Sequence, residues 1–330
     1  MIKKLLFILL FTYPQFSHSS VEVDFNIWLK KFKITAQKEG ISEETIINGL
    51  KNAKYLEQVI KYDRYQPEFF EDTKTYIKKR ATRSRMLKAK GLLIKNKKLF
   101  DEVEKEFKVE KELLLALWGI ETNFGKHVGK MDIISSLATL SFDKRRSEFF
   151  SKELIILLKL IDQKLIDVDA LYGSWAGAFG NFQFMPSAIE NYAIDYDKNN
   201  KIELKLSLHD AVASAANYLS KIGWEYQSSC FHKVELTKPI SKKYINTSAK
   251  KIKNYLTIKL WKKKGIVDIE QISDKNKAAL VIPDLAVPEG NENSPAFLVF
   301  ENYEKILKWN RSLRFGVTVC ILANMIKNEI

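Results

Sequence analysis

A single glutamate stands at the end of an apolar stretch. The segment LWGIETNFGK, residues 117–126, places Glu121 directly after residues 113–120, which are apolar on nearly every helical face. This pattern predicts a buried helix, and Asn123 and Gly125 suit its C-terminal stop. Burial should raise the pKa of the carboxyl group, which suits a general acid. The alternative is a structural glutamate that pairs with a buried arginine or caps backbone N–H groups.

A glycine-rich segment follows downstream. GSWAGAFGNFQFMPS, residues 173–187, carries Ser174 and Gln183 among small and aromatic residues. These two polar side chains could hydrogen-bond a sugar hydroxyl, and the glycines would permit close backbone approach. The alternative is a tight corner between packed helices.

An acidic loop is the third candidate. Its oxygen donors at alternate positions resemble the first half of an EF-hand calcium loop. The candidate ligands are Asp195, Asp197, Asn199, Lys201 (through its carbonyl) and Asp210. Asn200 stands where that loop has its glycine, and no glutamate closes it at position 12. The alternative is a solvated Asn/Asp turn.

The surrounding elements are predominantly helical by their spacing of apolar residues. Ser42 is a candidate N-cap, Pro67 should end an element, and Ser187 with Glu190 has the spacing of a capping box. The segments predicted to be helical are 40–53, 75–95, 110–121, 147–161 and 208–223, with a helical C-terminus over 301–326. Three alternating runs predict strands in a small insertion: TIKLW (257–261), AALVI (278–282) and AFLVF (296–300).

Composition bounds the class of protein. Hydrophobic residues make up 46% of the 330 residues, which indicates a globular chain. The formal net charge of +14 favours polyanionic surroundings such as a cell wall or a membrane surface. No module that interleaves basic and aromatic residues stands out, so no nucleic-acid partner is expected.

The first twenty residues predict a secretory signal peptide. Lys3 and Lys4 precede the apolar run Leu5–Phe11, and Ser17 and Ser19 offer small residues for cleavage. The alternative is a single-pass membrane anchor, but the apolar run is too short to span a bilayer. No cysteine follows the signal, so a lipoprotein is not expected.

Two cysteines are present, Cys230 and Cys320. In an exported chain they could form a disulfide, or they could be two buried thiols. With four histidines and no close spacing, they argue against a zinc site.

Taken in order, these segments resemble the lytic murein transglycosylase B family. The resemblance rests on YDRYQPEFF, TYIKKRAT, ALWGIETNFG, SLATLSFDKRRSEFF, GSWAGAFGNFQFMPS, DYDKNNKIEL and ANYLSKIGW. It implies a mainly α (α+β) fold, with a lysozyme-like α core, an N-terminal helical domain and a small β-containing insertion. The expected divisions are a signal peptide (1–20), the N-terminal helical domain (21–105), the catalytic core (106–224), the insertion (225–300) and a returning helical segment (301–330).

The resemblance also implies an activity. The family cleaves the MurNAc–GlcNAc β-1,4 bond of peptidoglycan and leaves 1,6-anhydromuramoyl ends, with one glutamate as acid and then base. Glu121 takes that role by position. The implied substrate contacts are Ser174, Gln183, Tyr76, Tyr218 and Asn310. The family has tyrosines around Asn310 where this chain has Trp309 and Phe315.

The remaining implications concern surroundings. The chemistry needs no cofactor, a structural calcium ion could fill the acidic loop, and the enzyme would be a soluble periplasmic monomer. Its partners would be peptidoglycan glycan strands, and could include cell-wall synthesis proteins. The alternatives are a lysozyme-like hydrolase, a non-catalytic wall-binding protein and a polyanion-binding protein.

Overall fold

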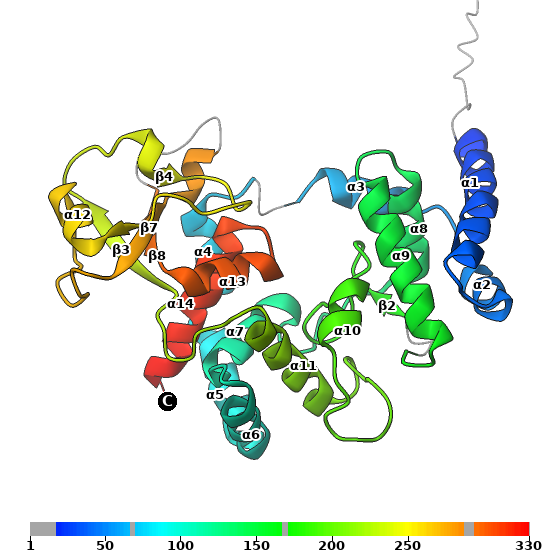
Figure 1. The fold of residues 1–330 in the computed structure, drawn as a ribbon, viewed down its shortest axis with the longest axis horizontal. Helices are drawn as coiled ribbons and strands as arrows, with labels where there is room; N and C mark the ends of the chain where they lie inside the picture. Colours follow the sequence, from blue (N-terminus) through cyan, green and yellow to red (C-terminus); the bar gives the residue numbers. More distant parts are fainter. Residues whose placement is uncertain (1–17, 67–69, 167–170, 287–293, 330) are drawn as a thin grey trace, which may run out of the picture.

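The chain folds into an elongated arrangement of helices with a small sheet at one end (Figure 1). The computed structural model describes residues 18–66, 70–166, 171–286 and 294–329. Most of the predicted signal peptide and the break expected at Pro67 lie outside these ranges. The mainly α (α+β) class is confirmed, because helices dominate and strands are few. No helix in the described part of the chain is long and apolar enough to cross a membrane.

One group of helices lies at the end opposite the sheet (Figure 1). Ser42 N-caps the second of them by accepting a hydrogen bond from the Thr45 backbone N–H, as predicted. Aromatic rings of Phe25, Trp28 and Phe142 pack together in this group. Its helices are α1 (His18–Lys38), α2 (Glu43–Leu50), α3 (Glu57–Arg64), α8 (Ile133–Phe142) and α9 (Ser147–Asp162).

A second group of helices includes the long C-terminal helix α14 (Leu313–Glu329), which packs against α7, α5 and α4. The helix predicted over 75–95 is wrong as one element. Ala81 leaves helical geometry, and the Thr82 hydroxyl accepts from the Arg85 backbone N–H to start a new helix. The other helices here are α4 (Thr73–Arg80), α5 (Arg83–Lys95), α6 (Lys97–Phe107), α7 (Lys111–Thr122), α10 (Pro186–Tyr192), α11 (Leu208–Lys221) and α13 (Glu301–Trp309).

The capping box predicted for Ser187 and Glu190 is also wrong. Helix α10 begins at Pro186, which needs no hydrogen-bond partner for its nitrogen. The Ser187 hydroxyl and backbone N–H both donate to the carboxylate of Glu153, at 2.7 and 2.9 Å. A carboxylate from another helix therefore satisfies this terminus.

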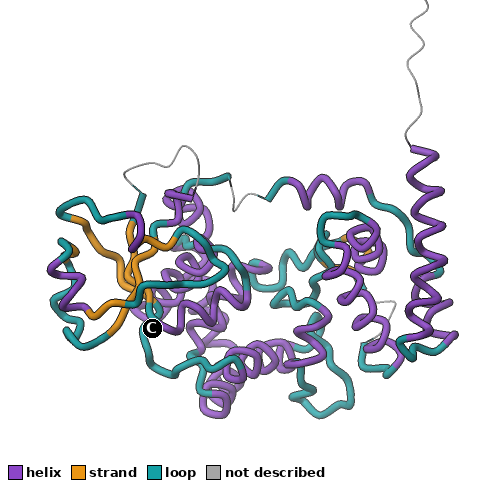
Figure 2. Tube along the Cα trace, turned by 45° about the horizontal axis from the view of Figure 1, so that its top comes forward, coloured by secondary structure: helices purple, strands orange, loops and turns teal. Residues whose placement is uncertain are grey.

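Most strands gather at one end of the molecule (Figure 2). They form a mixed sheet in the order β4-β7-β8-β3-β6, and β5 pairs with β7 off this path. AALVI and AFLVF form strands as predicted, but TIKLW is mainly helical. Ile258 and Trp261, three residues apart, bury one face of helix α12 (Ile258–Lys263). The strands are β3 (Phe231–Leu236), β4 (Ile245–Asn246), β5 (Leu256–Thr257), β6 (Ile266–Val267), β7 (Lys277–Val281) and β8 (Ala296–Val299), with a separate pair β1 (Met131–Asp132) and β2 (Tyr172–Gly173).

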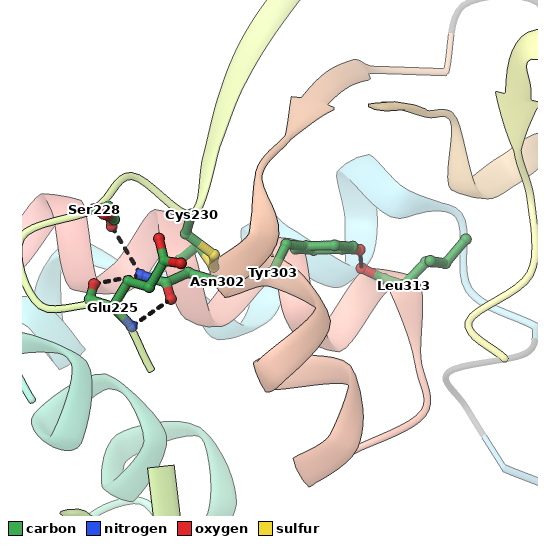
Figure 3. Close-up of a disulfide and its surroundings, with 7 residues drawn as sticks. Glu225, Ser228, Cys230, Asn302, Tyr303 and Leu313 are labelled. Carbon is green, nitrogen blue, oxygen red and sulfur yellow. Dashed lines mark hydrogen bonds between the residues drawn. A yellow bond between two sulfur atoms is a disulfide. The ribbon is translucent and has the colours of Figure 1, made fainter. Parts of the chain in front are cut away.

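A disulfide joins Cys230 to Cys320, which settles the alternatives left open by the sequence. It ties the start of β3 to α14. Beside it, the Asn302 side chain accepts from the Glu225 backbone N–H and donates to the carbonyls of Glu225 and Ser228 (Figure 3). The sheet-bearing segment is thus fastened to the helical core at its entry point.

Candidate active site

Glu121 is the penultimate residue of α7 and is partly buried. The helix stops where the sequence predicts: Asn123 has φ 51°, and its N–H donates to the Gly119 carbonyl. Gly125 also has positive φ, and a Cβ there would lie 2.6 Å from Asn181 Oδ1. The turn after Glu121 therefore requires a glycine at this position.

Asn181 fixes the glycine-rich segment against the end of α7. Its side-chain oxygen accepts from Trp118 Nε1 at 2.9 Å, and its carbonyl accepts from the Thr122 hydroxyl at 2.8 Å. Its amide nitrogen donates to the carbonyls of Leu204 and Lys205. Sequence reasoning missed Asn181. The clue in the sequence was its position directly after Gly180 in the glycine-rich segment.

The indole of Trp309 contacts the candidate acid directly. Its Nε1 donates to Glu121 Oε1 at 3.0 Å. The ring stacks on Tyr218, with ring centres 4.9 Å apart, and Tyr218 stacks on Tyr192 at 4.3 Å. Burial raises the pKa of Tyr218 to about 12, so its hydroxyl stays neutral and donates to the Lys308 carbonyl.

Two adjoining cavities, of about 600 and 270 Å³, form a cleft beside this stack. The larger contains Gln183, Tyr218 and Trp309, and the smaller contains Asn310. Residues that line both are Arg146, Phe149, Met185 and Arg311. The structure therefore brings three of the predicted substrate contacts into one cleft, next to the residue that holds Glu121.

The other predicted contacts are placed differently. The Gln183 amide donates to the carbonyls of Val128 and Gly180, and Ser174 Oγ accepts from the Ala178 N–H. Both side chains thus hold the glycine-rich segment in shape. Tyr76 is 4% exposed, lies under the Arg80 guanidinium, and is not among the residues lining the two cavities.

Only one acidic residue lines the described cavities, namely Glu153. It is 3% exposed, and both its oxygens accept from Ser187 at the start of α10. This carboxylate is occupied by a structural role. The cleft therefore offers no second acidic side chain comparable to Glu121 among its described lining residues.

A cluster of arginines lies beside the cleft. Asp63 is 2% exposed and accepts hydrogen bonds from Arg64, Arg145 and Arg146. Burial by itself would raise the pKa of Asp63, but the hydrogen bonds from Arg145 and Arg146 outweigh it and lower that pKa below its usual value. Sequence reasoning missed this cluster, although the run KRRS signalled a local excess of positive charge.

The acidic loop gathers three carboxylates. Oxygens of Asp195, Asp197 and Asp210 lie within 4.8 Å of one another. Asn200, in place of the expected glycine, adopts φ 68°, a conformation that asparagine tolerates. Carboxylate, amide and carbonyl oxygens are the ligands that calcium prefers, so the donor set fits this ion.

A carboxyl-bearing helix end, a glycine-rich wall and a cleft inside a mainly helical frame define a lysozyme-like protein. The sequence matches the transglycosylase SLT domain family over residues 24–324, so the chain belongs to that family. It is 42% identical over 117 residues to the membrane-bound lytic murein transglycosylase B of Escherichia coli K12. That alignment covers 35% of this chain and 32% of the relative's length.

Solved structures are similar over nearly the whole chain. SltB3 from Pseudomonas aeruginosa, in complex with NAG-NAM-pentapeptide, has a TM-score of 0.81 and 29% identity, covering 92% of this chain and 79% of SltB3. Escherichia coli Slt35, in complex with calcium, has a TM-score of 0.77 and 23% identity, covering 96% of this chain and 99% of Slt35. The second likeness concerns the fold alone.

Proposed function

We propose that this protein is a lytic transglycosylase that cleaves the MurNAc–GlcNAc β-1,4 bond of peptidoglycan and leaves 1,6-anhydromuramoyl ends. The observation that carries the proposal is the hydrogen bond to Glu121 from Trp309, which lines a cleft whose acidic lining residue, Glu153, is occupied at a helix terminus. Hydrolytic glycosidases use two carboxyl groups. A site with one is suited to a reaction whose nucleophile belongs to the substrate.

In this mechanism Glu121 gives its proton to the oxygen that leaves with GlcNAc, and the bond from that oxygen to C1 of MurNAc breaks. The muramoyl C6 hydroxyl then attacks C1, and the Glu121 carboxylate takes the hydroxyl proton. The glutamate returns to its starting protonation state and no water is consumed. Gln183, Tyr218 and Asn310, which line the cleft, would contact the sugars, whereas Ser174 would hold the glycine-rich wall in shape through its hydrogen bond from the Ala178 N–H.

Mass spectrometry of the products tests this directly. Digestion of isolated sacculi should release muropeptides whose muramoyl ends lack one water relative to reducing ends. Reducing ends in their place would identify a lysozyme-like hydrolase. Binding to sacculi without product release would identify a wall-binding protein.

The acidic loop is proposed as a structural calcium site, supported by its three convergent carboxylates and by the left-handed Asn200. The ion would be held by Asp195, Asp197, Asp210, the Asn199 amide oxygen and the Lys201 carbonyl. It would brace the loop before α11 and supply no chemistry to the cleft. Isothermal titration of calcium into the metal-free protein tests the site.

Export to the periplasm is proposed from the signal-like sequence of residues 1–20 and the murein substrate named for the Escherichia coli relative. A reporter that is active only after export, fused after residue 40, should be active. Activity of a cytoplasm-specific reporter at the same position would contradict export.

A further inference from the structure

We propose that Trp309 is a positioning residue that gives the two carboxyl oxygens of Glu121 different roles. Oε1 is held as a hydrogen-bond acceptor, and Oε2 carries the proton that is exchanged with the substrate. The inference rests on the proposed transglycosylase reaction and adds to it which oxygen takes part.

The chemistry of the indole carries the first step. An indole N–H can donate and cannot accept. Trp309 Nε1 lies 3.0 Å from Glu121 Oε1, within normal hydrogen-bond length. In a protonated carboxyl group the carbonyl oxygen is the better acceptor, so Oε1 remains the carbonyl and the proton resides on Oε2. A tyrosine, which the family resemblance implies for this segment, could donate or accept and would not impose this choice.

The surroundings of Trp309 hold the donor in place. Its ring is stacked on Tyr218 with an interplanar angle of 20°, and Phe184 lies against it with ring centres 5.3 Å apart. Tyr218 is stacked in turn on Tyr192 at 8°. Rotation of the indole would disrupt this column of rings, so its N–H keeps one direction during the reaction.

A fixed donor favours the first proton transfer. When Glu121 protonates the leaving oxygen it becomes a carboxylate, and its hydrogen bond from Trp309 becomes charge-assisted and stronger. The interaction is therefore tighter after transfer than before. This is the kind of contact that raises kcat more than it lowers KM.

The test compares Trp309→Phe with Trp224→Phe. The first removes the N–H and keeps an aromatic ring in the stack. The second removes a similar hydrogen bond, from Trp224 Nε1 to Glu110 Oε2 at 2.7 Å, away from the cleft. Loss of a hydrogen bond to a charged group in the transition state lowers a rate by about 10- to 100-fold. We therefore expect Trp309→Phe to lower kcat by about that factor, and Trp224→Phe to leave kcat unchanged.

The pH profile gives a readout that loss of packing would not give. Without the donor the carboxylate is less favoured, so the alkaline limb of kcat should move to higher pH in Trp309→Phe. The cleft's charged residues Arg146, Glu153, Lys308 and Arg311, and Arg85 behind Gly119, are present in every variant. An unchanged kcat and an unchanged alkaline limb in Trp309→Phe would overturn the inference.

A spectroscopic measurement separates this inference from the proposed reaction. The indole N–H NMR resonance of Trp309, assigned with Trp309→Phe, should shift with pH in the wild type and stay constant in Glu121→Gln. A resonance that does not respond to pH in the wild type rejects the role of Trp309 even if anhydro products form. Absence of anhydro products from the wild type rejects the reaction whatever the resonance does.

Discussion

The end of α7 and the loop before α11 both present carboxylates, but their hydrogen-bond donors differ. Glu121 receives an indole N–H from Trp309 beside an open cleft. In the loop, Asp195 accepts from the backbone of Asn199 and Asn200, and Asp210, in the first turn of α11, accepts from that of Tyr196 and Glu203.

The difference is one of charge density. Backbone donors hold Asp195 and Asp210, and the Ser207 hydroxyl donates to Asp197, so three carboxylates lie close together, where their mutual repulsion favours a cation. A single carboxyl group at a cleft can instead gain and lose a proton. In the proposed roles, the partners of an acidic residue, rather than its type, distinguish a proton-transfer site from an ion site.

The strongest way to break this comparison is Glu121→Gln. The amide keeps the size of the side chain and its carbonyl oxygen for Trp309, but it cannot deliver a proton. Turnover should fall by about 10²- to 10⁴-fold while the response of the fold to calcium stays the same. Release of anhydromuropeptides near the wild-type rate would show that another residue is the acid.

Calcium should raise the stability of the fold and leave the acid/base role of Glu121 unchanged. At a concentration one hundred times its dissociation constant, a bound ion adds about 2.7 kcal/mol to the free energy of unfolding. Urea denaturation in calcium and in EDTA should show this difference. Asp197→Asn should reduce it, whereas the exposed Asp24→Asn should not. Equal denaturation midpoints with and without calcium would contradict the proposed calcium site.

Asp63 extends the comparison to a carboxylate held by arginines. Its pKa is lowered in the folded state, so it contributes stability above the pKa of an unfolded aspartate, about 3.9, and that stability is lost as pH falls through the folded-state value. Asp63→Asn should lower the free energy of unfolding by about 2 kcal/mol at pH 7, because hydrogen bonds to a charged group are weakened. The same measurement at pH 3 should show a smaller difference; a constant difference would contradict the ionic explanation.

The smallest effect is expected for Asn200→Gly. Glycine relieves the left-handed strain but gains freedom in the unfolded chain, so stability should change by less than about 1 kcal/mol. Calcium affinity should be retained. A large gain in affinity would show that the asparagine distorts the loop, which isothermal titration can measure.

Local signals predicted the parts of the site that are local in the chain. The apolar run before Glu121 and the left-handed Asn123 are sequence neighbours, so the helix and its end could be predicted. TIKLW was misassigned because a short apolar alternation also fits one buried helix face at Ile258 and Trp261.

The missing parts depend on residues far apart in sequence. Glu153 replaced the predicted capping box from a distance of 34 residues, and Trp309 reaches Glu121 across 188. A tryptophan next to Asn310 is equally consistent with core packing. Its donor role follows only from the return of α13 to the core.

The disulfide determines what backbone cleavage does to the molecule. Cys230 and Cys320 are separated by 90 positions, and the segment between them contains strands β3 to β8 and α13 with Trp309. A protease that cuts the backbone anywhere in this segment produces two polypeptides that remain one molecule. Both Glu121 and Trp309 stay on that molecule until a reductant reaches the sulfur bridge.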